Sequence, residues 1–93
     1  MIRSFADAET ERFFATGTSR RLPADILKRA AMRLTQLGAV TSIDDLRVPP
    51  SNRIEALKGD RKGQWSVRIN DQWRVCFRFA DGDAFDVEIA DYH

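Results

Sequence analysis

Hydrophobic and polar residues alternate in the last third of the chain, with the period of two that is typical of β-strands. The apolar positions fall into three runs: Trp65, Val67 and Ile69, then Trp73, Val75, Phe77 and Phe79, then Phe85, Val87 and Ile89. Between the runs stand two short polar segments, residues 70–71 and 81–83, which suit tight turns. The pattern therefore predicts three antiparallel strands joined as hairpins, with a shorter strand before them at residues 53–57.

The polar positions of the same strands predict a second, open face of the sheet. Side chains at positions i and i+2 of a strand share one side. This side is therefore expected to carry Ser66, Arg68, Arg74, Cys76, Arg78, Asp86 and Glu88. Trp65 and Trp73 have the parity of the apolar side, so core packing is favoured for them over a role as stacking platforms for bases.

Helical signals dominate the first 40 residues. Asp7 suits the N-cap of a helix and Gly17 its C-terminal end, which predicts a helix near residues 7–16. Phe13 and Phe14 are its expected core anchors. Because the segment is otherwise polar, we expect this helix to be held loosely.

A second and stronger helix is predicted between Pro23, which suits its start, and Gly38, which is expected to end it. Its apolar residues recur at helical spacing: Ile26, Ala30, Leu34 and Leu37, with Leu27 and Ala31 beside them. Its other face carries Lys28, Arg29 and Arg33.

The remaining segments are short. Residues 2–5 read as a short strand, and the Pro49-Pro50 pair makes residues 44–52 a loop. Together the elements predict an α+β fold, in which two N-terminal helices pack on one face of a mostly antiparallel sheet of four to five strands.

Composition supports one folded domain spanning residues 1–93, since 43% of the residues are hydrophobic and 31% are charged. No apolar run approaches the roughly 18 residues of a membrane helix, and no signal peptide is evident, so we expect a cytoplasmic protein without a membrane partner. The lone Cys76 excludes an internal disulfide and is assigned no nucleophilic role. Nucleotide-loop and metal-ligand signatures are absent, and we expect no metal or other cofactor.

Charge is unevenly distributed, although the net charge is only +1. Residues 12–33 carry six basic residues against one acid, and residues 47–78 carry eight against three. Residues 79–93 carry five acids and neither Lys nor Arg. This distribution fits either ordinary solvated faces or a protein that binds nucleic acid through one face.

Arg74 and the C-terminal residues are the candidates for chemistry. Arg74 lies in mid-strand on the predicted open face, where it either pairs with Asp86 or Glu88 or is available to a ligand. Tyr92 and His93 follow directly on the last strand, as an uninvolved tail or as proton-transfer groups. Proton-transfer groups beside arginines are what phosphodiester cleavage requires.

Four segments carry a family resemblance: RIEALKGDR at residues 53–61, GQWSVR at 63–68, QWRVCF at 72–77 and EIADYH at 88–93. In this order, in a chain of this size, they resemble the HigB branch of the RelE superfamily of toxins, which includes the GraT-like plasmid-maintenance killer proteins. The similarity extends over the whole chain. It implies a RelE-like fold.

The resemblance also implies an activity: that of a type II toxin, an endonuclease that enters the ribosomal A site and cleaves mRNA there without a metal. In this chemistry the ribose 2′-OH attacks the adjacent phosphate, cations stabilise the developing charge, and an acid protonates the departing 5′-oxygen. The implied partners are the ribosome, mRNA and a helix-turn-helix antitoxin of the HigA kind. Operator DNA would be contacted only through that antitoxin.

Site residues follow from the same resemblance. Arg74 matches the superfamily's phosphate-contacting arginine, and its planar fork suits a phosphate. The terminal triplet matches that of the HigB branch, with His93 as general acid, Tyr92 in stacking or proton transfer, and Asp91 as an orienting group. The expected RNA-binding residues are Lys58, Arg61, Lys62 and Arg68.

Glu55 is a departure from the family pattern, because some HigB proteins carry a histidine at the corresponding position. Glu55 is interpreted either as a catalytic base or as a salt-bridge partner of Arg53, Lys58 or another loop cation. The departure keeps a second hypothesis open, in which the protein binds RNA or the ribosome with weak or no cleavage. Two surfaces are candidates for the antitoxin: the acidic last strand and the basic helix face of residues 20–33.

Overall fold

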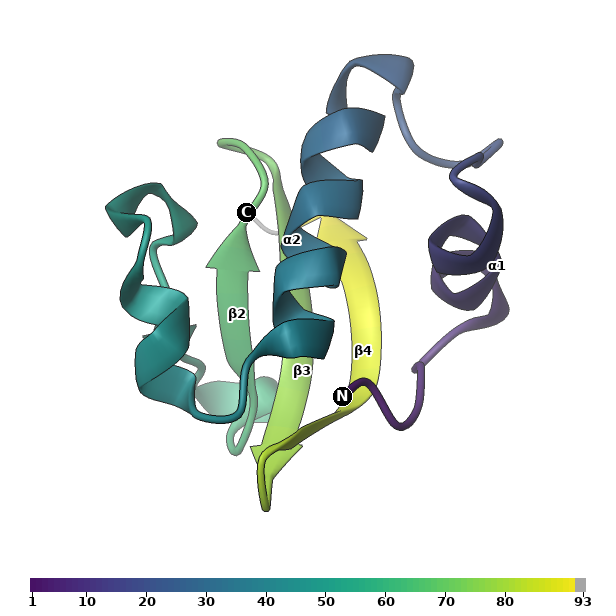
Figure 1. Ribbon diagram of the computed structural model, residues 1–93. Helices are drawn as coiled ribbons and strands as arrows, with labels where there is room; N and C mark the ends of the chain where they lie inside the picture. The colour runs from purple at the N-terminus through teal and green to yellow at the C-terminus, as the bar shows by residue number, and fades with distance from the viewer. Residues whose placement is uncertain (92–93) are drawn as a thin grey trace.

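An antiparallel sheet of four strands forms the centre of the protein in a computed structural model, which describes residues 1–91 (Figure 1). The strands stand side by side in chain order: β1 (Glu55–Ala56), β2 (Trp65–Arg68), β3 (Trp73–Ala80) and β4 (Asp83–Asp91). Each neighbouring pair is antiparallel. The alternating pattern therefore predicts the three main strands correctly, and β1 lies within the expected residues 53–57.

The N-terminal segment runs along the outer edge of β4, where it makes two isolated parallel bridges, Ile2 with Ala84 and Phe5 with Val87. The expected strand at residues 2–5 is thus reduced to these bridges. The N-terminal amino group and Arg3 both contact the Asp83 carboxylate, at 3.2 and 3.0 Å. These contacts cover an edge that would otherwise expose unpaired backbone groups.

Helix α1 (Ala8–Thr16) begins and ends where its capping residues predict. The Asp7 carboxylate accepts a 2.6 Å hydrogen bond from the backbone N–H of Thr10, and Gly17 has the left-handed φ of 77° that ends many helices. Phe13 is buried as expected, whereas Phe14 is 43% exposed. The helix therefore has one core anchor rather than two.

Helix α2 (Leu27–Ala39) crosses one face of the sheet, in front of β3 and β4 (Figure 1). A single 3-10 turn (Ala24–Ile26) follows Pro23 and leads into it. The predicted stripe is buried: Ile26, Ala30, Leu34 and Leu37 are each at most 3% exposed. Gly38 does not end the helix, which continues to Ala39. The free-energy cost of one glycine in a helix is smaller than the stabilisation that the helix gains by packing against the sheet.

A β-bulge changes the expected facing of β4. Cys76 lies opposite Glu88, but Arg78 lies opposite Phe85, so β4 contains one extra residue between these pairs. Asp86 takes up the irregularity with a φ of 53°. The prediction that Phe85 shares a face with Val87 was therefore wrong, and Phe85 lies on the side of Arg78.

The expected loop at residues 44–52 is largely made of two 3-10 turns, Ile43–Arg47 and Pro50–Asn52. Pro49 and Pro50 stand at the start of the second turn, where the backbone N–H that proline lacks would have no partner within the turn. Asn52 is fully buried, and its side-chain amide donates to the carbonyl of Leu46 and to Gln36 of α2, at 3.0 and 2.9 Å. These bonds fix the loop against the helix.

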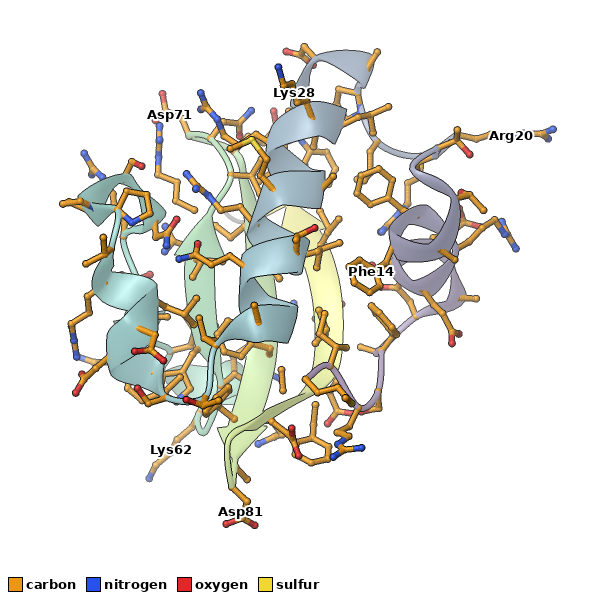
Figure 2. All side chains as sticks on the ribbon, in the orientation of Figure 1. Phe14, Arg20, Lys28, Lys62, Asp71 and Asp81 are labelled. Carbon is orange, nitrogen blue, oxygen red and sulfur yellow. The ribbon has the colours of Figure 1, made fainter. Side chains whose placement is uncertain are left out.

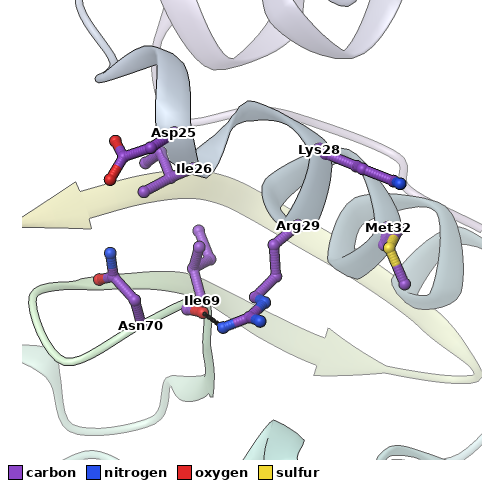
Figure 3. Close-up of a pocket in the computed structure, with 7 residues that line it drawn as sticks. All are labelled: Asp25, Ile26, Lys28, Arg29, Met32, Ile69 and Asn70. Carbon is purple, nitrogen blue, oxygen red and sulfur yellow. Dashed lines mark hydrogen bonds between the residues drawn. The ribbon is translucent and has the colours of Figure 1, made fainter.

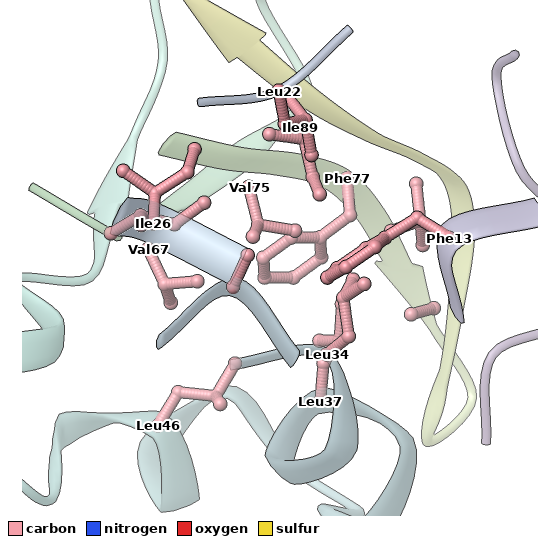
Figure 4. Close-up of a cluster of buried hydrophobic side chains, with 14 residues drawn as sticks. Phe13, Leu22, Ile26, Leu34, Leu37, Leu46, Val67, Val75, Phe77 and Ile89 are labelled. Atoms are coloured by element: carbon pink, nitrogen blue, oxygen red, sulfur yellow. The ribbon is translucent and has the colours of Figure 1, made fainter. Parts of the chain in front are cut away.

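One hydrophobic core lies between α2, α1 and the sheet (Figure 4). Its largest fully buried side chains include Phe13, Phe77, Leu34, Leu37, Leu46 and Ile69. Trp65 and Trp73 pack against this cluster, which confirms core packing for both. Within residues 1–91, no helix has the length and apolar composition needed to cross a membrane.

A substitution of Thr10 tests how α1 is attached to the sheet. Its buried hydroxyl accepts a 3.2 Å hydrogen bond from the backbone N–H of Ile89 in β4. Thr10→Val leaves that N–H buried and unpaired, so the free energy of unfolding should fall by about 1–3 kcal/mol in urea denaturation. Thr35→Val on the exposed side of α2 is the control, and an equal loss in both variants would contradict the attachment.

Candidate functional site

The polar face of the sheet carries a row of side chains that crosses all four strands. The strand registers place Glu55 opposite Ser66, Ser66 opposite Cys76, and Cys76 opposite Glu88. Ser66 and Cys76 in the middle of the row are fully buried, while Glu55 at its end is exposed. The face expected to be open is therefore covered at its centre.

Two arginines form the neighbouring row, because Arg68 of β2 lies directly opposite Arg74 of β3. Like charges in such cross-strand positions repel one another and destabilise a sheet unless something compensates them. Each arginine turns to a different partner. Arg68 forms an ion pair with Asp71 in the following turn.

Arg74 is held by two oxygen atoms. Its Nε donates a 2.7 Å hydrogen bond to the Ser66 hydroxyl, and its Nη2 donates a 2.6 Å bond to the backbone carbonyl of Arg53. Neither partner is charged, so the pairing of Arg74 with Asp86 or Glu88 that the sequence left open is not made among residues 1–91. Within the described part of the chain, the positive charge of Arg74 is therefore positioned without an ion-pair partner.

The two carboxylates of β4 that were considered for Arg74 pair with other arginines. Glu88 accepts a 2.6 Å bond from Arg61, and Asp86 lies 3.5 Å from Arg78. Arg61 reaches Glu88 from the 3-10 turn Gly59–Arg61. This ion pair thus ties the loop after β1 to the last strand.

The predicted RNA-binding residues do not gather at one point. Lys58 and Lys62 flank the Gly59–Arg61 turn and are exposed. Lys62 points away from the molecule at one end, and the turn that carries Asp71, the partner of Arg68, lies at the opposite end (Figure 2). The candidates therefore border the polar face on two sides.

The predicted catalytic residues are only partly brought together. Glu55 makes no ion pair among residues 1–91, so its interpretation as a salt-bridge partner is not supported. Asp91 lies opposite Trp73, on the other side of the sheet from Arg74, and its carboxylate accepts a 2.9 Å hydrogen bond from Gln72. Tyr92 and His93 lie outside the described residues.

Cys76 lies at the centre of the polar face and is completely buried. Burial raises the pKa of its thiol, because the charged thiolate would lose its hydration. Arg61 and Arg74 act in the opposite direction but more weakly. The thiol is therefore protonated at neutral pH, in agreement with the inert role that the sequence predicts.

Arg33 differs from its expected place on the exposed side of α2, since only 7% of the residue is exposed. Its Nε donates a 2.9 Å hydrogen bond to the carbonyl of Arg68, and Arg29 likewise donates to the carbonyl of Ile69 at 3.2 Å. Burial lowers the pKa of Arg33, and the nearby charges of Arg29 and Arg68 lower it further. These arginines connect α2 to the end of β2.

A hollow of about 530 Å³ opens beside this contact, between the start of α2 and the turn after β2 (Figure 3). Its lining combines two cationic side chains with an acid, an amide and three apolar side chains: Asp25, Ile26, Lys28, Arg29, Met32, Ile69 and Asn70. Within the described part of the chain, no group of three or more His, Cys, Asp or Glu residues is arranged to hold a metal ion.

Comparison with known proteins identifies the family. The family model described as "RelE-like toxin of type II toxin-antitoxin system HigB" matches residues 3–93. The chain belongs to this family of HigB toxins. Its match includes every predicted site residue, and the resemblance read from the sequence is confirmed.

This HigB-family chain aligns with two curated relatives over nearly the whole length of each. Endoribonuclease HigB of Proteus vulgaris is 34% identical over 93 residues, which is 100% of both chains. Toxin HigB-1 of Vibrio cholerae is 39% identical over 85 residues, or 90% of both chains.

Solved structures confirm the predicted RelE-like α+β fold. The YoeB–YefM complex of Staphylococcus aureus matches with a TM-score of 0.61 at 15% identity, over 100% of this chain and 98% of that chain. YafQ of Escherichia coli matches with a TM-score of 0.57 at 11% identity, over 98% of this chain and 93% of its own. Two helices on one face of an antiparallel sheet are common to the prediction and the structure.

Ser66 and the backbone of Arg53 are parts of the site that sequence reasoning missed. Ser66 was expected on the polar face but was assigned no role, and no sequence signal distinguishes it from an ordinary strand serine. A carbonyl has no sequence signature either. The contact with Arg74 depends on strand register and on the path of the loop before β1.

Cys76 provides a test of the covered face. Because its thiol is buried and its pKa is raised, the native protein should react with a thiol-specific aromatic disulfide at least about 100-fold more slowly than the unfolded protein at pH 8. Absorbance of the released thiolate measures both rates. Equal rates in native buffer and in guanidinium would show that the centre of the face is open.

Proposed function

We propose that this HigB-family toxin is a ribosome-dependent endoribonuclease, which cleaves mRNA in the ribosomal A site and thereby inhibits translation. The observation that carries the proposal is the charge of Arg74, fixed on the polar face of the sheet by neutral partners. Family membership and the name of the Proteus vulgaris relative, an endoribonuclease, support it. The proposed place of action is the cytoplasm, where ribosomes and mRNA meet.

The proposed reaction needs no metal. The 2′-oxygen of a ribose attacks the adjacent phosphorus, its proton passes to a base, and the bond from phosphorus to the 5′-oxygen breaks. Arg74 stabilises the charge that develops on the phosphoryl oxygens. His93 protonates the departing 5′-oxygen, Tyr92 stacks on a base or assists proton transfer, and Asp91 orients them.

Glu55 is the proposed base among the described residues. It is exposed at the end of the polar row, opposite Ser66, and has no ion-pair partner among residues 1–91 to compete for its carboxylate. A carboxylate in this state is available to accept a proton. The proposed contacts with the RNA backbone come from Lys58, Arg61, Lys62 and Arg68.

The alternative function is binding of RNA or the ribosome with little or no cleavage. One observation favours it: Asp91 lies on the other side of the sheet from Arg74. A cleavage assay separates the two functions, since binding alone would arrest translation while leaving the message intact.

Arg74 is the first residue to test. Arg74→Ala removes the cation that stabilises the transition state, so cleavage of a defined mRNA on programmed ribosomes should fall by about 100-fold or more. Arg74→Lys keeps the charge without the fork and should retain intermediate activity. Primer extension locates the new RNA ends, with naked mRNA alongside as the control.

Circular dichroism and urea denaturation show whether these variants remain folded. Full cleavage by folded Arg74→Ala would remove Arg74 from the site. Ribosome binding by the wild-type protein without new RNA ends would favour the alternative function.

The proposed partner that holds the toxin inactive is a HigA-like helix-turn-helix antitoxin, and the basic side of α2 is its better candidate surface. On the acidic strand, Asp83, Asp86 and Glu88 already form ion pairs. Lys28 and Arg29 form no ion pair among residues 1–91 and line the hollow beside α2. The proposed contact is with an acidic segment of the antitoxin, because two cations and a single acid, Asp25, line this hollow.

Charge reversal distinguishes the two surfaces. Lys28→Glu should weaken binding of the cognate antitoxin at least about 10-fold, because it places an acid against an acidic segment. Asp81→Lys, in the exposed turn at the start of the acidic strand, should leave it within about 2-fold. Isothermal titration calorimetry gives both affinities, and the reverse ranking would move the interface to β4.

A further inference from the structure

We propose that Ser66 is a positioning residue for RNA cleavage, which together with the Arg53 carbonyl fixes Arg74 in the orientation that receives a phosphate. The inference rests on the proposed function and extends it. Ser66 itself does not touch the RNA in this arrangement. It acts through the guanidinium of Arg74.

Ser66 has the burial that a positioning role requires. Its exposed fraction is 0%, and its hydroxyl lies 2.7 Å from Nε of Arg74. A hydroxyl that is buried in this way has few alternative positions, because the close-packed surroundings restrict its rotation. The bond to a charged donor is also stronger than one between neutral groups.

The strand register gives the direction of the contact. Ser66 lies opposite Cys76, two residues after Arg74, so the Arg74 side chain extends diagonally along the sheet to reach the hydroxyl. Arg68 lies directly opposite Arg74 instead. The bond to Ser66 therefore draws the guanidinium away from a like charge and towards the centre of the polar row.

The second support depends on an uncommon backbone conformation. Arg53 has a φ of 45°, in the left-handed region that non-glycine residues seldom adopt. It directly follows the turn Pro50–Asn52, which the buried Asn52 ties to α2. In this conformation its carbonyl accepts a 2.6 Å hydrogen bond from Nη2 of Arg74.

These two bonds determine which edge of Arg74 remains available. A guanidinium has five N–H groups in a planar fork, and here Nε and one N–H of Nη2 are engaged on one edge. The edge formed by Nη1 and Nη2 keeps parallel N–H groups and has no partner among residues 1–91. Two parallel N–H groups are the arrangement that binds two phosphate oxygens at once.

Ser66→Ala is the decisive substitution. It removes one support while leaving the Arg74 charge in place, so kcat for A-site cleavage should fall about 10- to 100-fold with KM changed less than about 3-fold. Ser66→Thr keeps the hydroxyl and should recover most of the rate. Ser4→Ala is the matched control, because the Ser4 hydroxyl also accepts a hydrogen bond, from the Asp86 backbone at 2.9 Å. Asp86 lies four residues along β4 from Ala90, the cross-strand partner of Arg74.

A double-substitution cycle shows whether Ser66 acts through Arg74. In an Arg74→Lys background the fork is absent, so adding Ser66→Ala should reduce kcat less than about 2-fold. An undiminished effect of Ser66→Ala in that background would overturn the positioning role. Urea denaturation of every variant separates a loss of folding from a loss of rate.

Nitrogen-15 NMR of the arginine side chains tests the contact without any activity. The Nε–H of Arg74 should exchange with solvent at least about 10-fold faster in Ser66→Ala than in the wild-type protein. If wild-type protein cuts no mRNA but this exchange changes as expected, the proposed function fails and the contact stands. If wild-type protein cuts and Ser66→Ala cuts at the same kcat, the positioning role fails alone.

Discussion

Burial of the apolar stripe of α2 against one face of the sheet is the interaction on which the rest of the structure depends. Leu34 and Leu37 meet Val75 and Phe77 in a core with almost no exposed surface. Because strand side chains alternate, this burial sends every second residue of β2 and β3 to the opposite face. Arg68, Arg74 and Arg78 are thereby collected on one side of the sheet.

Organisation of positive charge is the second constraint, since the polar face and the nearby end of α2 bring several arginines close together. Arg33 and Arg29 are held by backbone carbonyls at the end of β2, and Arg74 is held by a hydroxyl and a carbonyl. Neutral oxygens hold these cations in place, and none of the three forms an ion pair among residues 1–91. For a toxin that is proposed to act on RNA, such charge favours binding of a phosphate backbone.

The ion pairs of the last strand complement this arrangement. Glu88 binds Arg61 and Asp86 lies beside Arg78, so the carboxylates that could have neutralised Arg74 are engaged elsewhere. The bulge at Asp86 also changes the facing of this strand: Phe85 lies on the polar side, while Val87 and Ile89 remain in the core. The acidic strand therefore supports the loop after β1, and its carboxylates at Asp86 and Glu88 leave Arg74 without an ion pair to either of them.

The sequence by itself determined the order of the helices and strands, the caps of α1, the buried stripe of α2 and the family, because these depend on local spacing and on motifs that are continuous in the chain. Tertiary structure decided the extent of α2 beyond Gly38, the burial of Arg33, the facing of Phe85 and the exposure of Phe14. It also brought Ser66 and the Arg53 carbonyl to Arg74. Each of these depends on contacts between segments far apart in the chain or on a one-residue shift of register, and neither leaves a periodic trace in the sequence.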